Sequence, residues 1–181
     1  MHPTFVRSLA AAAMLAFTLS AEAQAPAGGE TLVIELKTGK VVIQLKPELA
    51  PKHVARVKQL AAEGFYNGQI FHRVLEGFMA QTGDPQGTGG GGSTYPDLQA
   101  EFTRYAFRRG TIGAARTPDP NTANSQFFIC FDDRGCLSLT GSYTVWGQVV
   151  SGMELVDKIA KGEPPANPDR MITVRVAADV A

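Results

Sequence analysis

Residues 71–84 read FHRVLEGFMAQTGD, and this stretch decides which fold the chain adopts. Apolar and polar residues alternate on either side of Gly77, which indicates a strand, a tight turn and a second strand. In this arrangement Arg73 and Gln81 project near a phenylalanine and a methionine. We therefore expect a polar pair beside an apolar floor.

A second run, SQFFI at residues 125–129, is again apolar and carries one amide, Gln126. Taken singly, the residues of both runs have ordinary explanations. An arginine among aromatic residues is often a surface residue that lies across apolar neighbours. Phenylalanines and methionines are by default residues of the core. Neither run alone therefore identifies a binding groove.

Together the two runs resemble the cyclophilins, the cyclosporin-binding family of peptidyl-prolyl cis-trans isomerases. The resemblance extends from about Thr31 to Val176, which is nearly the whole chain after its N-terminal segment. Because several motifs occur in the order of the family, a proline-binding groove is favoured over the ordinary explanations. The matching motifs are Phe71-His72-Arg73, Gly77-Phe78-Met79, Gln81, Gly83-Asp84 and Ser125-Gln126-Phe127-Phe128-Ile129.

The resemblance also implies roles for individual residues. Arg73 matches the catalytic arginine of the family, and Gln81 matches the residue that steadies this arginine and the substrate backbone. The remaining matches are substrate-binding residues. Those of the proline pocket are Phe78, Met79, Phe128 and Leu137, those of the backbone-binding groove are Ala115, Arg116 and Gln126, and Tyr143 provides an aromatic wall.

Three positions depart from the familiar eukaryotic members. Cys136 falls where they carry a tryptophan at the pocket rim, Tyr143 where many carry a histidine, and Arg116 where they carry an asparagine. The indole contributes strongly to cyclosporin recognition in the family, so we expect weak cyclosporin binding. These departures resemble the exported bacterial branch of the family.

The rest of the chain predicts a mostly-β domain with two helices. Residues 32–36 and 41–45 read as a hairpin, residues 127–131, 143–150 and 171–176 as further strands. Apolar residues at helical spacing predict one helix that ends at Gly64 and another over Met153–Ala160 that ends near Gly162. The resemblance implies a closed eight-stranded antiparallel β-barrel capped by these two α-helices.

The N-terminus predicts export. An apolar, alanine-rich stretch follows Arg7, and Ala21-Glu22-Ala23 has the small-x-small pattern of a signal peptide, with cleavage after Ala23 rather than after Ala25. The stretch is too short for a transmembrane anchor. We therefore expect a signal peptide at 1–23, a flexible spacer at 24–30 and one cyclophilin-like domain at 31–181. In a Gram-negative bacterium the destination would be the periplasm.

Composition restricts the partners. Seventeen basic and seventeen acidic residues cancel, which gives no indication of a nucleic-acid or membrane partner. Without heptads there is also no reason to expect anything but a monomer. The chain lacks the motifs of hydrolases and nucleotide-binding enzymes, and no cofactor or metal is implied. The glycine run at 87–92 formally contains G-x-G-x-x-G, but turn residues follow it, and in the family it borders the substrate groove.

The remaining reactive residues have structural explanations. Cys130 and Cys136 could form a small-loop disulfide, or Cys130 could be a buried thiol, and the apolar run before it favours two free thiols. Their spacing, with histidines at 53 and 72, does not match a zinc site. We expect His72 to be a packed histidine facing away from Arg73, and His53 to lie on the surface of the first helix.

The sequence as a whole predicts a secreted isomerase that acts on X–Pro bonds of exported proteins. Its partners would be proline-containing segments of unfolded or flexible polypeptides. The alternative is a non-catalytic proline-peptide-binding module or holdase chaperone that uses the same groove.

Overall fold

The computed structural model describes residues 30–177, so the predicted signal peptide and almost all of the spacer lie outside the described residues. The strands are β1 (Thr31–Leu36), β2 (Gly39–Leu45), β3 (Arg73–Leu75), β4 (Met79–Thr82), β5 (Thr111–Ala114), β6 (Phe127–Cys130), β7 (Val145–Ser151) and β8 (Thr173–Ala177). The helices are α1 (Pro51–Ala62), α2 (Asp133–Cys136) and α3 (Met153–Val156), with a 3-10 turn, η1, at Leu137–Leu139.

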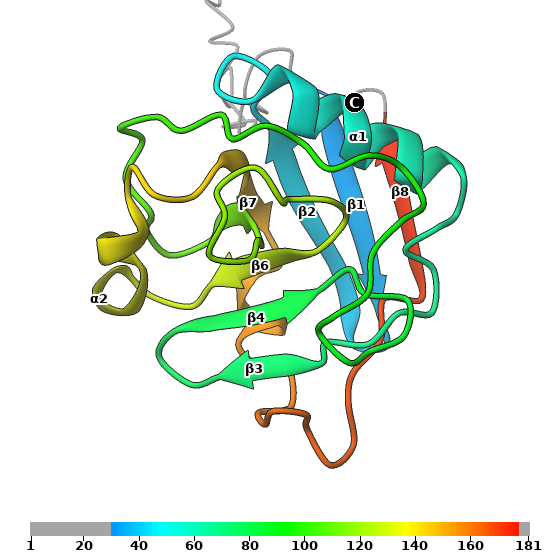
Figure 1. Cartoon of the computed structure of the whole chain (residues 1–181). Helices are drawn as coiled ribbons and strands as arrows, with labels where there is room; N and C mark the ends of the chain where they lie inside the picture. The colour runs from blue at the N-terminus through cyan, green and yellow to red at the C-terminus, as the bar shows by residue number, and fades with distance from the viewer. Residues whose placement is uncertain (1–29, 178–181) are drawn as a thin grey trace, which may run out of the picture.

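All eight strands belong to one antiparallel sheet, in the order β3-β4-β6-β5-β7-β2-β1-β8. The sheet curls strongly around its core, as Figure 1 shows, which confirms the mostly-β prediction. The prediction of a closed barrel was wrong. No ladder joins β3 to β8 within residues 30–177. The segments that precede them are linked by an isolated bridge between Ile70 and Arg170 and by a bond from the N–H of Gly68 to the carbonyl of Met171 at 2.6 Å. The result is an open half-barrel.

Helix α1 covers one end of the curled sheet, next to β8 (Figure 1). Proline is favoured in its first turn, and Gly64, at φ +70°, follows its end. The helix buries Val54, Val57 and Leu60 on the apolar stripe that the sequence predicts. The sequence predicts His53 on the surface, but the residue is buried. Its Nδ1 lies 2.6 Å from a carboxylate oxygen of Glu101, which supplies a polar partner inside the protein.

The second predicted helix is shorter than expected. Regular α-helix ends at Val156 instead of Ala160, since the N–H groups of Lys158 and Ile159 donate to carbonyls only three residues back. The N–H of Ala160 donates to the Asp169 carboxylate at 2.8 Å. No helix within the described range is long and apolar enough to span a bilayer.

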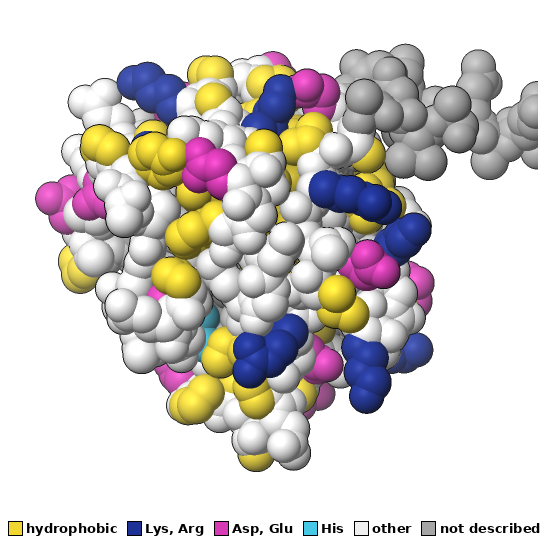
Figure 2. All heavy atoms as spheres, turned by 90° about the vertical axis from the view of Figure 1, so that its right-hand side faces the viewer, with side chains coloured by type: hydrophobic (Ala, Val, Ile, Leu, Met, Phe, Trp, Pro, Cys, Tyr) yellow, Lys and Arg dark blue, Asp and Glu magenta, His cyan; other side chains and the backbone are white. Residues whose placement is uncertain are grey.

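The main core lies between α1 and the concave side of the sheet. Tyr66, Phe127 and Trp146 form its centre, with Phe127 making edge-to-face contacts with the other two rings. On the outer face that carries β8, basic and acidic side chains are interspersed, as Figure 2 shows. A second, smaller apolar cluster surrounds Met79 and Phe128 on the other side of strands β4 and β6, and it forms the base of the candidate site.

Candidate active site

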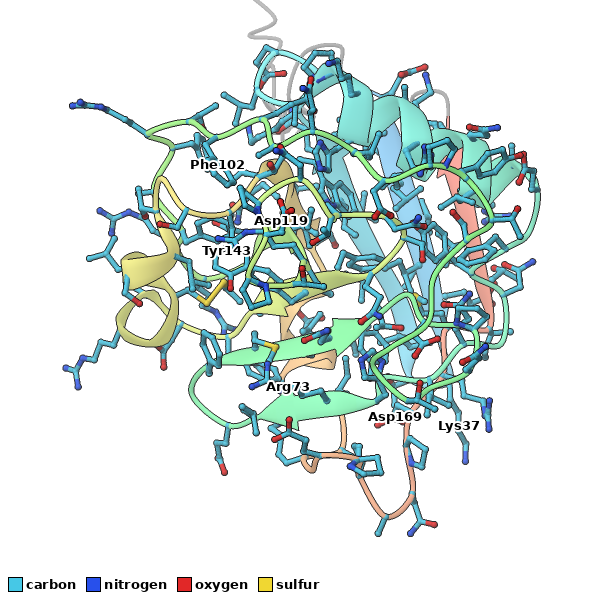
Figure 3. The ribbon with its side chains drawn as sticks, viewed as in Figure 1. Lys37, Arg73, Phe102, Asp119, Tyr143 and Asp169 are labelled. Atoms are coloured by element: carbon cyan, nitrogen blue, oxygen red, sulfur yellow. A yellow bond between two sulfur atoms is a disulfide. The ribbon has the colours of Figure 1, made fainter. Side chains whose placement is uncertain are left out.

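The hairpin of β3 and β4 presents Arg73 and Gln81 side by side. The two residues are register partners in the antiparallel ladder, and Figure 3 shows Arg73 on this hairpin. Gly77 makes the reversal with φ +68°, a conformation that favours glycine, and the N–H of Phe78 donates to the carbonyl of Leu75 at 3.0 Å. The strand-turn-strand prediction is therefore confirmed.

A cavity of about 100 Å³ opens between this hairpin and the segment that follows η1. Eight of the ten residues predicted for the site line it, and they come from five separate parts of the chain. The lining residues are Arg73, Phe78, Met79, Gln81, Ala115, Arg116, Phe128, Leu139 and Tyr143. The cavity is thus apolar at its floor and carries two guanidinium groups and one amide at its edge.

The floor is fixed by aromatic packing. The Phe128 ring stacks on Phe107 with centroids 5.7 Å apart, and it meets Tyr143 edge-on at the same distance. Gly113 makes this packing possible, because a Cβ there would lie 2.4 Å from the Phe128 ring and 2.7 Å from the Phe107 ring. Phe128 is therefore packed against Phe107 and Tyr143, and it also lines the cavity.

Leu137 was predicted in the proline pocket, but its side chain is half exposed and does not line the cavity. Leu139 takes that place. Both residues belong to η1, and in a 3-10 turn, with three residues per turn, positions two apart point to different sides. The sequence pattern alone did not indicate this turn.

A disulfide joins Cys130, at the end of β6, to Cys136, at the end of α2, and the prediction of two free thiols was wrong. Both cysteines are fully buried beside Met79 and Phe128, so burial of Cys130 and bonding are compatible. The bond ties α2 to the sheet directly beneath the cavity.

Residues 30–177 contain no cluster of three or more histidines, cysteines or acidic residues that could hold a metal.

The two polar residues of the hairpin have different partners. Arg73 Nε donates to Oε1 of Glu163 at 2.7 Å, while Gln81 Nε2 donates to Oε1 of Gln126 at 2.9 Å. Gln81 was predicted to steady Arg73, yet the described residues contain no hydrogen bond between them. Glu163 was missed, because it lies 90 residues away in a proline-rich linker with no distinguishing pattern.

Gln126 lines a second, larger cavity of about 370 Å³ that adjoins the first. Its Nε2 donates to the carbonyls of Gly89 and Gly91 at 2.9 and 2.7 Å, so the glycine run forms one wall of this cavity. Gln126 thus lies in the neighbouring cavity rather than in the apolar one. Ala115 and Arg116 line both cavities.

The glycine wall is held by one carboxylate. Asp84 accepts N–H donors from Gln86, Thr88, Gly89 and Gly91 at 2.7 to 3.1 Å. Burial alone would raise the pKa of Asp84, but these donors lower it below its ordinary value. His72 is buried outside the lining of either cavity, and burial lowers its pKa, which agrees with the prediction of a packed histidine.

Arg116 joins the two walls of the apolar cavity. Its guanidinium lies 4.4 Å from the centre of the Tyr143 ring, and its Nε and Nη2 donate to the carbonyl of Ser142. Figure 3 shows Tyr143 and Phe102 on this upper side of the site, and Phe102 also faces the guanidinium, at 5.8 Å. The Arg116 side chain therefore holds the two walls together and also places a positive charge beside the cavity.

Residues 31–177 match the family model described as cyclophilin type peptidyl-prolyl cis-trans isomerase/CLD. The chain belongs to the cyclophilin-type peptidyl-prolyl cis-trans isomerases. A probable peptidyl-prolyl cis-trans isomerase of Brucella suis is 50% identical over 97% of this chain and 98% of its own.

More distant cyclophilins agree. Peptidyl-prolyl cis-trans isomerase-like 3 of Homo sapiens is 37% identical over 72% of this chain and 82% of its own. A crystal structure of a cyclophilin type isomerase from Cryptosporidium parvum superimposes with a TM-score of 0.75 at 29% identity, covering 84% of this chain and 99% of that one. The same protein was also solved in the presence of the dipeptide Ala-Pro.

Proposed function

We propose that Arg73 is the catalytic group of this cyclophilin and that the apolar cavity receives the ring of the substrate proline. One observation carries the proposal: the guanidinium-bearing Arg73 lies at the edge of a cavity floored by Phe78, Met79 and Phe128. The apolar floor matches the apolar proline ring. In the proposed complex the Arg73 guanidinium lies beside the nitrogen of that ring, within reach of a hydrogen bond.

The chemistry requires no nucleophile or base. Rotation about a peptide bond is slow because resonance must be broken, at a cost of about 18–20 kcal/mol. In the twisted transition state the proline nitrogen becomes pyramidal and gains a lone pair. An N–H of Arg73 donates to this lone pair and so favours the twisted form over both planar forms. Only such preferential binding of the transition state accelerates the reaction.

The larger cavity holds the polypeptide that precedes the proline. Its walls supply the backbone groups of the glycine run, the amides of Gln81 and Gln126, and the main chain at Ala115 and Arg116. These are hydrogen-bonding groups, as an extended peptide backbone requires. Substrates are therefore proline-containing segments in an unfolded or flexible state.

The cellular role is the folding of exported proteins. Isomerisation of X–Pro bonds takes tens to hundreds of seconds without a catalyst, which is slow enough to limit folding. The signal-peptide pattern before residue 24 and the disulfide between Cys130 and Cys136 both support an oxidising compartment outside the cytoplasm. In a Gram-negative bacterium this compartment is the periplasm, where the enzyme acts as a monomer without cofactor.

The experiment that tests the proposal is an isomerisation assay on a proline peptide with Arg73→Ala. Loss of one preorganised donor lowers kcat/KM by at least about tenfold, while the circular dichroism spectrum is unchanged. Arg175→Ala, at an exposed arginine on β8, is the matched control and keeps full activity. Full activity of Arg73→Ala refutes the mechanism. Peptide binding without any acceleration by the unmodified protein supports the alternative, a binding module or holdase.

Cyclosporin is expected to bind weakly. The residue at the position of the family's rim tryptophan, Cys136, is fully buried and bonded to Cys130, so it offers no surface to the drug. Inhibition at nanomolar concentration would count against the correspondence at this position.

A further inference from the structure

The orientation of Arg73 is the starting point. An arginine presents five N–H donors in a planar fork, so a partner on one donor fixes the direction of the others. The Arg73 side chain is 36% exposed. Apolar contacts with the cavity alone would leave a long side chain free to change rotamer. The bond from Nε to Glu163 engages the inner donor and leaves the terminal N–H groups for the cavity.

The backbone places Glu163 there. Val74 and Gly162 form an isolated antiparallel bridge, with N–H···O distances of 2.8 and 2.9 Å in the two directions. In an antiparallel pair, the residue before one partner lies opposite the residue after the other. Arg73 and Glu163 are therefore directly opposed, close enough for their side chains to meet. Gly162 has φ +147°, and a Cβ there would lie 2.6 Å from the backbone of Pro165, so the path of the linker at this residue requires glycine.

Charge gives Glu163 a second effect. Two guanidinium groups, those of Arg73 and Arg116, line the same cavity. Arg116 donates to carbonyl oxygens of Thr117, Pro118 and Ser142, so its charge is not neutralised by these bonds. Within residues 30–177, Glu163 is the carboxylate that is paired with Arg73. It offsets the repulsion between the two cations and holds Arg73 in the orientation that faces the cavity.

We propose that Glu163 is a positioning residue for isomerisation, which fixes the Arg73 guanidinium through Nε and acts on the substrate only through that group. This inference rests on the catalytic role proposed for Arg73. Because the carboxylate does not line the cavity, its removal affects the chemical step more than substrate binding.

The test compares kcat and KM of Glu163→Ala, Glu163→Gln and the unmodified protein. We expect Glu163→Ala to lower kcat about fivefold with KM changed less than about twofold, because the interaction serves the transition state. Glu163→Gln keeps an acceptor oxygen and recovers about half of the loss on a logarithmic scale. Asn167→Ala, an exposed position in the same linker, is the matched control and leaves kcat unchanged.

Two readouts separate positioning from a merely structural role. In ¹⁵N-labelled protein the Nε–H signal, assigned by its absence in Arg73→Ala, shifts and exchanges faster with water in Glu163→Ala. On the Arg73→Ala background, Glu163→Ala causes no further loss of activity, since coupled residues are not additive. An unchanged or raised kcat in Glu163→Ala, an unmoved Nε–H signal, or an equal loss on both backgrounds overturns the inference. Full activity of Arg73→Ala alone would instead refute the proposed function.

Discussion

Phe127 and Phe128 are neighbours on β6, yet they serve opposite sides of the sheet. The Phe127 ring lies edge-on to Trp146 at 5.3 Å and to Tyr66 at 5.6 Å, in the main core. The Phe128 ring stacks on Phe107 and forms the floor of the cavity. Both are almost fully buried, so burial alone does not distinguish a core residue from a site residue.

The difference lies in what faces each ring. Alternation along a strand sends successive side chains to opposite faces, so one short strand contributes to the core and to the site. On the Phe127 side, packed side chains surround the ring. On the Phe128 side, one face of the ring borders a cavity of about 100 Å³. A change at Phe127 should therefore act on stability, and one at Phe128 on activity.

The largest expected effect is on the core side. Phe127→Ala removes a ring from a fully packed cluster, which costs about 3–5 kcal/mol of unfolding free energy. Urea denaturation measures this loss, and the kcat/KM of the fraction that remains folded is unchanged. A strong loss of activity per folded molecule would show that the two sides of β6 are not independent.

Phe128→Ala should lower activity more than stability, the opposite of Phe127→Ala. Its stability cost is smaller than that of Phe127→Ala, because the ring already has a cavity on one side. The missing floor instead lowers kcat/KM by at least about tenfold, since the proline ring loses its apolar contact. Both quantities are measured on the same preparation. Equal stability losses with preserved activity would contradict the division between core and site.

Much of this division could be predicted from the sequence. The hairpin at 71–84 and the run at 125–129 have a period of two and a glycine turn, which local rules interpret directly. Glu163 could not be predicted, because its partner is determined by a bridge between segments 90 residues apart. The same holds for Glu101, which reaches the first turn of α1 from a distant loop. Long-range contacts of single polar residues leave no periodic signal.

The errors have a common cause as well. The sequence predicts Leu137 in the pocket and a free thiol at Cys130, and both residues lie in or next to the short segment of α2 and η1. Elements of three or four residues have no measurable periodicity, so the sequence does not determine which of their side chains point inward. The prediction of a closed barrel was wrong for a related reason. Whether β3 pairs with β8 depends on the curvature of the whole sheet, which no local pattern determines.

Removal of the disulfide, on the site side of β6, should have an intermediate effect on stability and on substrate binding. Replacing both cysteines by alanine removes a link with a sequence separation of 6, which costs about 2 kcal/mol by the loop-entropy estimate. Since α2 and η1 carry Leu139 towards the cavity, KM for a proline peptide also rises. Thiol titration of the unfolded, non-reduced protein should find no free thiol, whereas two would contradict the bond.

A smaller effect is expected at α1, on the core side. Ala50 at its N-cap provides no side-chain acceptor, and Glu101 accepts instead from the N–H groups of Lys52 and His53, both at 3.1 Å. Glu101→Gln weakens this distant cap and lowers the unfolding free energy by about 1 kcal/mol. Activity is unchanged, because Glu101 lines neither cavity. A loss of kcat/KM would show that α1 and the site are coupled.

The smallest effect is a dependence of stability on pH that originates on the core side. Burial lowers the pKa of His53 below its ordinary 6.5, although the nearby Glu101 carboxylate acts in the opposite direction. Burial also lowers the pKa of His72. The unfolded chain therefore binds more protons than the folded one below about pH 6.5, so stability is full above that pH and falls as the pH decreases through it. His53→Asn removes one of the two contributions and should flatten the decline between pH 7 and 5, measured by urea denaturation at each pH. A decline of the same slope in both proteins would mean that the pKa of His53 is the same in the folded and unfolded states, and a steeper decline in the variant would mean that the bond to Glu101 outweighs burial.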